Sequence, residues 1–169
     1  VSSSTITKKF DLLDGPGFLA GATALGGNPT TLNKGGSTDW QDQIFRTAIS
    51  TSHNLSYGGG GAASNYRLSL GYQDQQGIIK ESGMQRYSVR ANTSHKMFND
   101  KLVIDAQFTF ANVKDQQAPI SDNAGYEGSI IGAALSANPT QNVTSSDGKF
   151  IQPGNDQRNP VAWLAYHDD

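Results

Sequence analysis

The sequence has no cysteine, few charged side chains and no long apolar run. Without cysteine there is no disulfide framework, no thiolate metal site and no cysteine nucleophile. Leu, Ile, Val and Phe make up only about a fifth of the chain, yet the net charge of −2 is too small for a charged disordered tail. The same small charge gives no electrostatic reason to expect nucleic acid as a partner. What remains is a weakly charged, glycine-rich composition that is typical of β-structure.

The sequence also lacks the patterns of a membrane helix and of a signal peptide. The longest apolar candidate runs from Ile130 to Leu135, far short of the roughly 18 residues that a membrane helix needs. The residues that follow Val1 show no basic region followed by an apolar one. We therefore expect neither a helical span nor a leader in these residues.

From about residue 51 to residue 113 the chain alternates between apolar and polar side chains with period two. The pattern predicts four strands, near 51–59, 65–75, 85–95 and 101–113, each with one apolar and one polar face. The apolar face is expected to carry Tyr66, Leu68, Leu70, Tyr87, Val89, Leu102, Ile104, Phe108 and Phe110. The opposite face is expected to carry Arg67, Arg90, Asp105 and Gln107.

The connections between these strands alternate between short and long. Gly58–Ser64 and His95–Asp100 are tight turns, whereas Asp74–Gln85 and the proline-containing stretch 114–169 are long polar segments. Strands of roughly 9–11 residues with short turns at one end and long loops at the other are typical of a transmembrane β-barrel. On pattern alone, a half-buried soluble sheet stays an equal alternative.

Three segments predict short helices inside the long loops. Asp14–Leu25 begins with an aspartate, a glycine and a proline, which form a plausible N-cap and first turn. Tyr126–Asn138 has apolar residues at helical spacing and stops before Pro139, and Pro160–Tyr166 is a third candidate. At the front, Ser2–Phe10 is interpreted as the end of a strand.

Several longer runs resemble a known family. They are Thr38-Asp39-Trp40-Gln41-Asp42-Gln43-Ile44-Phe45-Arg46-Thr47-Ala48, His53-Asn54-Leu55-Ser56, Asn65-Tyr66-Arg67-Leu68-Ser69-Leu70-Gly71-Tyr72, Gln76-Gly77-Ile78-Ile79-Lys80 and Arg86-Tyr87. Together they closely resemble the early barrel of TonB-dependent outer-membrane transporters, and more narrowly the SusC/RagA branch. Later matches to loop signatures of that branch are Ala137-Asn138-Pro139-Thr140, Asp147-Gly148 and Asn159-Pro160-Val161-Ala162.

The resemblance implies an all-β fold, namely part of a 22-stranded transmembrane β-barrel with an N-terminal plug. It implies import of a glycan or peptide across the bacterial outer membrane, with energy delivered through TonB and with a SusD-like surface lipoprotein as a lid. On that topology residues 1–10 end the first strand and 11–48 form the first extracellular loop with a short helix. Residues 49–113 are then strands two to five, and 114–169 are a long extracellular loop with short helices. The apolar face would meet outer-membrane lipid and the polar face the lumen.

Candidate substrate-binding residues are the loop aromatics Trp40, Tyr126 and Trp163. For each of them structural packing is an alternative, and for Trp40 the family-typical motif favours an anchoring role. The three histidines, His53, His95 and His167, show no metal-ligand spacing, and no carboxylate pair points to catalysis. We therefore expect no metal, no cofactor and no enzyme activity.

The competing hypothesis is a secreted or surface-exposed β-sandwich module that binds glycans or acts as an adhesin. In a sandwich the apolar face of the strands would be buried against a second sheet, whereas in a barrel it would face lipid. A soluble hydrolase is a third possibility that would require a pair of converging carboxylates. The destination of the apolar face therefore separates the first two hypotheses.

Overall fold

The computed structural model of the chain describes residues 1–120, 129–152 and 158–166. These residues form two compact units, a β-sheet unit (1–4, 48–77 and 83–116) and a helical unit (5–47, 78–82 and 117–169). No helix in the described ranges has the length and apolar character needed to cross a membrane. Each unit is built from local sequence signals that can be followed residue by residue.

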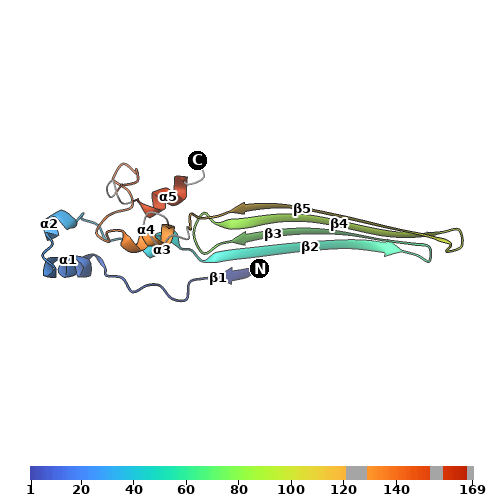
Figure 1. The fold of residues 1–169 in the computed structure, drawn as a ribbon, viewed down its shortest axis with the longest axis horizontal. Helices are drawn as coiled ribbons and strands as arrows, with labels where there is room; N and C mark the ends of the chain where they lie inside the picture. Colours follow the sequence, from blue (N-terminus) through green and yellow to red (C-terminus); the bar gives the residue numbers. More distant parts are fainter. Residues whose placement is uncertain (121–128, 153–157, 167–169) are drawn as a thin grey trace. The chain divides into compact units, whose positions relative to one another are not determined.

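The sheet unit is a five-stranded antiparallel meander in the order β1-β2-β3-β4-β5 (Figure 1). The strands are β1 (Ser2–Ser4), β2 (Ala48–Gly60), β3 (Ser64–Gln76), β4 (Gly83–Met97) and β5 (Leu102–Gln116). Every strand therefore pairs with its neighbour in sequence. At roughly 3.4 Å per residue, the 15 residues of β4 or β5 extend for about 50 Å.

The four long strands lie where the alternation predicted them, but each is longer than expected. The β2–β3 turn is reduced to residues 61–63, and Gly61 N donates to Ser64 O at 2.7 Å. The β4–β5 turn places Phe98, Asn99 and Asp100 at φ of 55°, 58° and 64°, in the left-handed region that tight hairpins use. The strands extend further because the polar residues at their ends continue the ladder instead of starting the loops.

The first strand is shorter than the sequence indicates. The interpretation of Ser2–Phe10 as strand holds only as far as Ser4, since β1 pairs with β2 over Ser2–Ser4 alone. The physical reason lies further along the chain, because Lys9 and Phe10 bond to side chains of the helical unit rather than to a strand.

Five short helices can be described in the helical unit, within residues 5–47, 129–152 and 158–166. They are α1 (Gly15–Ala24), α2 (Pro29–Leu32), α3 (Trp40–Ile44), α4 (Ile130–Ser136) and α5 (Pro160–Tyr166). Asp14 caps α1 by accepting from Gly17 N at 2.8 Å, and Pro16 lies in the first turn, as the sequence predicted. The predicted helix at Pro160–Tyr166 is confirmed, and α4 lies within the predicted range 126–138. Helices α2 and α3 were not predicted.

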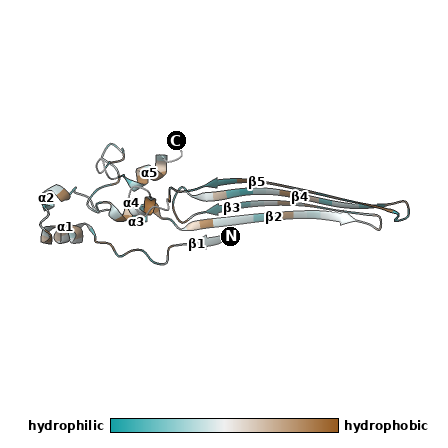
Figure 2. Cartoon of the chain, in the orientation of Figure 1, coloured by the Kyte–Doolittle hydropathy of each residue, from teal (hydrophilic) through white to brown (hydrophobic). Residues whose placement is uncertain are grey.

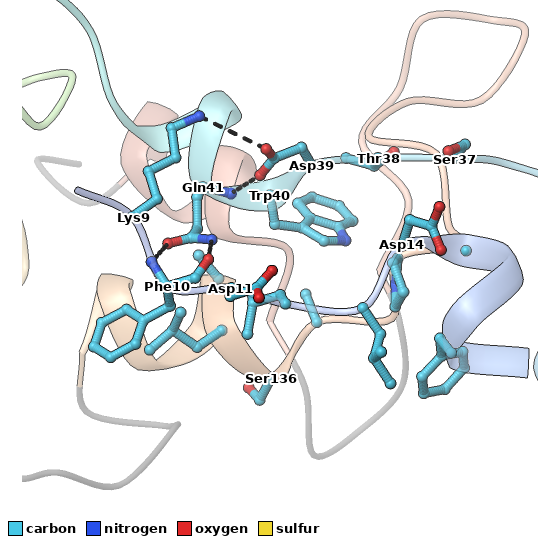
Figure 3. Close-up of a pocket in the computed structure, with 18 residues that line it drawn as sticks. Lys9, Phe10, Asp11, Asp14, Ser37, Thr38, Asp39, Trp40, Gln41 and Ser136 are labelled. Carbon is cyan, nitrogen blue, oxygen red and sulfur yellow. Dashed lines mark hydrogen bonds and ion pairs between the residues drawn. The ribbon is translucent and has the colours of Figure 1, made fainter. Parts of the chain in front are cut away.

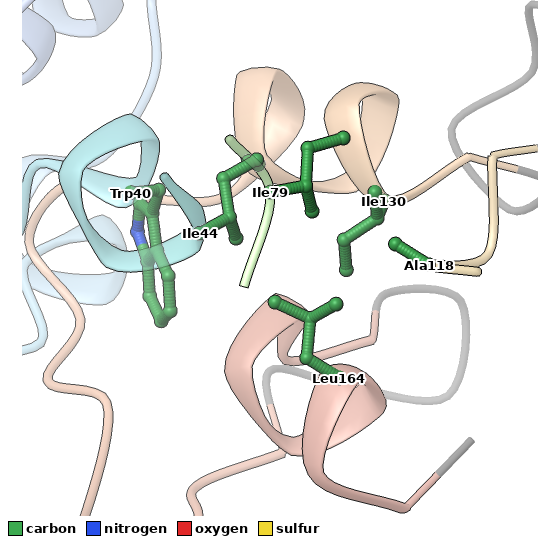
Figure 4. Packing of buried hydrophobic residues seen from close by; sticks show 7 residues of the cluster. Trp40, Ile44, Ile79, Ala118, Ile130 and Leu164 are labelled. Atoms are coloured by element: carbon green, nitrogen blue, oxygen red, sulfur yellow. The ribbon is translucent and has the colours of Figure 1, made fainter. Parts of the chain in front are cut away.

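The core of the helical unit is small and is assembled from five segments (Figure 4). The side chains of Ile44 from α3, Ile130 from α4 and Leu164 from α5 converge, with exposed fractions of 0%, 0% and 4%. Ile79 and Ala118 complete the cluster from the connecting segments. The core therefore joins stretches of chain that lie more than 100 residues apart in the sequence, and it fixes the loops as one folded unit.

Candidate functional site

The register of the sheet unit gathers the predicted apolar residues on one face. Leu68 pairs with Ala91 and Leu70 with Val89, while Val89 and Ala91 pair in turn with Phe110 and Phe108. The face is exposed rather than buried. Figure 2 colours each residue of these strands by its hydropathy. The exposed large members of the face are Leu55, Tyr57, Tyr66, Leu68, Leu70, Tyr87, Leu102, Ile104, Phe108 and Phe110. Such a continuous apolar surface is far larger than the patches that soluble monomers leave uncovered.

Aromatic side chains form two groups on this face. Tyr72 lies with its ring centroid 5.0 Å from Tyr87 and 6.3 Å from His53, towards the end of the strands that leads into the helical unit. Tyr57 and Tyr66 form a second pair at 5.9 Å, close to the tight β2–β3 turn. The stretch between these two tyrosine groups is apolar and contains leucine, valine and alanine together with Phe108 and Phe110. Two aromatic rows that border an apolar band are typical of the two interfaces of a membrane-spanning sheet.

The opposite face carries the predicted polar set. One row of paired residues across β2 to β5 reads Gly58, Arg67, Asn92, Gln107, and the next reads Ser56, Ser69, Arg90, Thr109. Asp105 pairs with Ser94 in a third row, which adjoins the row of Arg67 and Asn92 on the side away from Arg90. The structure thus brings together Arg67, Arg90, Asp105 and Gln107 on one face, and separates all of them from the apolar residues.

In the helical unit, the run Asp39-Trp40-Gln41-Asp42 caps α3 and binds the segment at Phe10. The Asp39 carboxylate caps α3 by accepting from Gln41 N at 2.9 Å and from Asp42 N at 3.2 Å. Gln41, only 4% exposed, uses both ends of its side-chain amide on the backbone of Phe10. Its oxygen accepts from Phe10 N at 3.0 Å and its nitrogen donates to Phe10 O at 2.9 Å, so the side chain imitates a neighbouring β-strand.

Ion pairing adds a second attachment for the same segment. The Lys9 ammonium donates to the Asp42 carboxylate and lies 3.7 Å from Asp39 Oδ2. The bond to Lys9 lowers the pKa of Asp42, and the bond to Asp42 raises the pKa of Lys9. These groups are exposed and screened by solvent, so the pair orients the segment more than it stabilises the fold.

The run Asn138-Pro139-Thr140 forms hydrogen bonds with the segment from Leu32 to Thr38. Asn138 Nδ2 and Thr140 Oγ1 both donate to Leu32 O, at 2.8 and 2.9 Å. Gly36 N donates to Thr140 O at 2.6 Å, and Thr38 N donates to Pro139 O at 2.8 Å. Residues 34–38 and 138–141 therefore lie side by side as a short irregular ladder.

Between these segments the helical unit has a cavity of about 520 Å³. Its wall combines apolar side chains with three carboxylates, as Figure 3 shows around Trp40 and Gln41. The lining includes Phe10, Leu13, Phe18, Trp40, Leu135, Asp11, Asp14 and Asp39. The cavity therefore offers carboxylate oxygens and apolar side chains to a bound group.

The loop aromatics named as substrate contacts differ in their surroundings. Trp40 is 4% exposed and its Nε1 donates to Asn138 O at 2.9 Å, so its ring belongs to the core and to the cavity wall. Trp163 is half-buried against the core, and the Arg158 guanidinium lies 5.0 Å from its ring centroid. For both residues these contacts favour the structural role. Tyr126 lies outside the described residues.

No three histidine, cysteine, aspartate or glutamate side chains converge as a metal site within the described ranges. His53 stacks against Tyr72, and His95 lies 2.9 Å from Thr93 Oγ1, while His167 falls outside those ranges. The histidines that can be placed therefore belong to the sheet surface.

Sequence reasoning missed two polar residues that organise the structure. The Asn159 side chain, fully buried, donates from Nδ2 to Val143 O and Ile151 O at 2.8 and 2.9 Å. Its Oδ1 accepts from Val161 N at 3.0 Å and thereby caps α5. An asparagine before a proline is a recognisable capping signal. The second residue, Gln41, had no such signal, because its partner is the backbone of a distant segment.

The sequence is similar to curated TonB-dependent receptors. It is 35% identical, over its full length, to the TonB-dependent receptor SusC of Bacteroides thetaiotaomicron, of which it covers 18%. It is 26% identical over 93% of its length to the TonB-dependent receptor P3 of Formosa agariphila, of which it covers 16%. The chain thus spans less than a fifth of the length of these relatives. No family model matches the chain.

The fold is similar to a solved structure. The RagAB peptide transporter matches with a TM-score of 0.59 and 24% identity, over 78% of this chain and 15% of that one. A second structure, the RagAB peptide importer in its closed-closed state, matches with a TM-score of 0.57 and 22% identity. The expectation of an all-β, antiparallel fold of the transporter type is confirmed.

Proposed function

Because the chain corresponds over its full length to a segment of SusC/RagA-type TonB-dependent receptors, we propose that it forms five early strands and two outer loops of a nutrient importer in the bacterial outer membrane. The apolar face of the sheet unit lies against lipid, and the polar face lines the lumen. The helical unit is made of the first and third extracellular loops together with residues 78–82 from the connection between β3 and β4. The imported nutrient is a glycan or a peptide.

One observation carries this proposal, namely the exposed apolar face of strands 13–15 residues long. Placing such a surface in water is costly, because each Å² of apolar surface removed from water contributes about 25 cal/mol. A β-sandwich module would bury it under a second sheet. All five named strands of the described residues belong to one sheet, so no second sheet covers this face. Lipid is the partner that the apolar surface and its bordering aromatic rows fit best.

The partners follow from the family and belong to the proposal. A TonB protein supplies energy through parts of the receptor that these residues do not contain. A SusD-like surface lipoprotein covers the outer loops. We infer these partners from the similarity to SusC/RagA-type receptors.

The test compares two neighbouring residues of β3 in the full-length receptor, expressed in its own outer membrane. Leu70 lies on the apolar face and pairs with Leu55 and Val89, whereas Ser69 points to the opposite face. An arginine that faces lipid near the middle of the membrane costs about 2–4 kcal/mol. We expect Leu70→Arg to lower the amount of folded receptor strongly, measured by heat-modifiable gel migration of outer-membrane fractions.

Ser69→Arg is the matched control, because it adds the same side chain one residue away but on the lumen face. We expect its folded amount to stay close to that of the unmodified receptor. Equal losses in both variants, or a loss confined to Ser69→Arg, would contradict the assignment of the faces. Growth on candidate glycans and peptides as sole nutrients, with the receptor gene deleted and restored, then identifies the nutrient class.

A further inference from the structure

The apolar face of the sheet unit continues to the tip of the β4–β5 hairpin. Met97 pairs with Leu102 in the last row of the ladder, two residues beyond the row in which β3 begins at Ser64. Both side chains lie on the same face as Val89 and Phe108, because an even number of residues separates them along their strands. The β4–β5 hairpin thus extends past the β2–β3 turn (Figure 1) and carries the apolar face with it.

The turn at this tip holds an exposed aromatic side chain in an unusual backbone conformation. Phe98 follows Met97, its side chain is 71% exposed, and its φ of 55° lies in the left-handed region. A bulky residue rarely adopts this region, whereas glycine and asparagine do so more easily. Residues kept in such conformations often serve a purpose other than the packing of their own element. The Phe98 ring is therefore placed for contact with a partner outside the sheet unit.

The edge of the apolar band nearest the tight turns crosses the ladder rows at an angle. On β2 the band ends at Tyr57, which shares a row with Leu68 and Ala91. On β5 it ends at Leu102, in the row of Met97, and Met97 lies six residues beyond Ala91 on β4. The edge therefore shifts by roughly 20 Å along the strands over three strand spacings, which together measure about 14 Å.

The opposite edge of the band shifts in the same direction. It follows Tyr72 on β3 and Tyr87 on β4, which pair with each other, whereas the position opposite Tyr87 on β5 is taken by the polar Asn112. The last apolar residue on β5 is Phe110, two residues closer to the tip. The two edges correspond to strands inclined by roughly 25–55° to the membrane normal, which brackets the 35–45° tilt of strands in membrane barrels.

We propose that the tip of the β4–β5 hairpin inserts into the inner-leaflet interface of the outer membrane, with Phe98 at the boundary between phospholipid headgroups and acyl chains. Because the strands are inclined, this tip reaches the membrane level of Tyr57 although it extends further along the strands. Lys101 is exposed in the same turn, so its ammonium can reach the lipid phosphates while the Phe98 ring stays in the apolar layer. This inference rests on the proposed function, since it requires that the apolar face meets lipid. It adds that a turn, and not the strands alone, contacts the membrane.

The test measures membrane depth in the full-length receptor, reconstituted in vesicles of equal parts phosphatidylethanolamine and phosphatidylglycerol. A nitroxide is attached to Phe98→Cys, the 169 residues having no other cysteine, and any cysteine elsewhere in the receptor is replaced by serine. Electron paramagnetic resonance compares relaxation of the label by oxygen, which is enriched in lipid, with relaxation by a water-soluble nickel chelate. We expect the oxygen-to-nickel ratio at position 98 to be at least about threefold higher than at a site in water, because apolar oxygen partitions out of water.

Ala62→Cys is the matched control in water. Ala62 is exposed at the tip of the neighbouring β2–β3 turn, beyond the edge of the band at Tyr57. We expect its label to be accessible to nickel, whereas upright strands would place Phe98 further from the membrane than Ala62. Leu70→Cys is the reference in lipid and should give the highest ratio, because Leu70 lies inside the apolar band.

A second measurement needs no label. Phe98→Asn relieves the left-handed backbone but removes the apolar ring, so contact with lipid and contact with water predict opposite signs. With the tip in lipid, Phe98→Asn should lower the temperature of half-unfolding by at least about 1 °C, measured by heat-modifiable gel migration in the same vesicles. Phe98→Trp keeps an aromatic ring and should leave that temperature unchanged.

Three results would overturn the proposal. One is an equal oxygen-to-nickel ratio at positions 62 and 98. Another is a label at position 98 that neither oxygen nor nickel reaches, which would mean that a further segment of the receptor covers the tip. The third is an unchanged or higher temperature of half-unfolding in Phe98→Asn. A high ratio at Leu70→Cys would leave the proposed function intact in each case, whereas a low ratio there would contradict the proposed function itself.

Discussion

At the scale of single residues, buried side-chain amides form the hydrogen bonds to backbone groups that helices and strands form elsewhere. Asn159 makes four hydrogen bonds from a fully buried position and joins the segments at Val143 and Ile151 to the start of α5. Gln41 does the same for the segment at Phe10. Loops can be well folded without strands when one side chain satisfies several backbone groups at once.

Substitution of Asn159 should therefore loosen the helical unit selectively. Asn159→Ala removes the side-chain donor from Ile151 O, whereas Val143 O keeps its bond from Ile151 N at 3.1 Å, and an unsatisfied group of this kind costs about 1–3 kcal/mol. We expect faster cleavage by protease near residues 143–152 of the full-length receptor, with membrane assembly retained. The exposed Asn142 provides the control, because Asn142→Ala should leave the cleavage rate unchanged.

The ion pair of Lys9 predicts a pH dependence with a defined sign. The pKa of Asp42 is lowered in the folded state, so its contribution is present above the unfolded value near 3.8 and is lost as pH falls further. The pKa of Lys9 is raised, so its contribution persists below 10.5 and is lost as pH rises above that value.

Between about pH 5 and pH 9, protease accessibility of residues 5–14 should thus be constant in the unmodified receptor. Asp42→Asn should raise that accessibility at neutral pH by a small amount that vanishes in high salt, since the pair is exposed. A strong change between pH 6 and pH 8 would instead point to a histidine.

At the scale of elements, the hairpin between β2 and β3 depends on close backbone approach. A Cβ on Gly60 would lie 2.5 Å from Ser64 O and 2.8 Å from Asn65 Cα, whereas a Cβ on Gly61 meets nothing within 4 Å. Overpacking of this kind typically costs about 1–3 kcal/mol.

We therefore expect Gly60→Ala to reduce the folded fraction of the receptor in heat-modifiable gel migration, and Gly61→Ala to leave it unchanged. Similar losses in both variants would show that the turn itself, rather than the contact at Gly60, limits assembly.

The same scale shows what the sequence could and could not predict. Alternation of apolar and polar residues predicted the positions of β2 to β5. It also predicted which residues share a face, because a shift of one residue would exchange the apolar and the polar face. Asp14 and Pro160 located α1 and α5 through capping chemistry. Helix α3 was missed because five residues are too few for a periodic pattern, although Asp39 before Trp40 was a usable cap signal. The early end of β1 could not be predicted, since it depends on the distant side chains of Gln41 and Asp42.

The candidate site likewise has features that the sequence could predict and features that it could not. The polar and apolar faces followed from period two, and the register brings their predicted members together. The proximity of Arg67 to Arg90 depends on which strands are neighbours and on their register. Strand pairing and register are properties of the folded sheet, so the alternation along a single strand could not predict them.

At the scale of the whole molecule, the sheet has two unpaired edges. β1 covers β2 only at Ala48–Ser50, so the rest of β2, from Thr51 to Gly60, has a free edge, as does the outer side of β5. Unpaired backbone groups of this kind are costly in lipid, and in water they act as templates for other strands.

An isolated 169-residue chain should therefore fail to insert as a monomer. When it is diluted from urea into lipid vesicles, we expect β-rich aggregates by infrared spectroscopy and by size-exclusion chromatography. The full-length receptor under the same conditions should give a heat-modifiable monomer. A monomeric, membrane-inserted 169-residue species would contradict the requirement for neighbouring strands.

The two bonds between the Gln41 amide and Phe10 have a consequence for sequence drift. Because Gln41 contacts only the backbone N and O of position 10, the side chain at that position can change freely while the segment keeps its place. Proline is the exception, since it lacks the N–H that Gln41 Oε1 accepts from. The segment around position 10 can therefore change the chemistry of its side chain without having to refold.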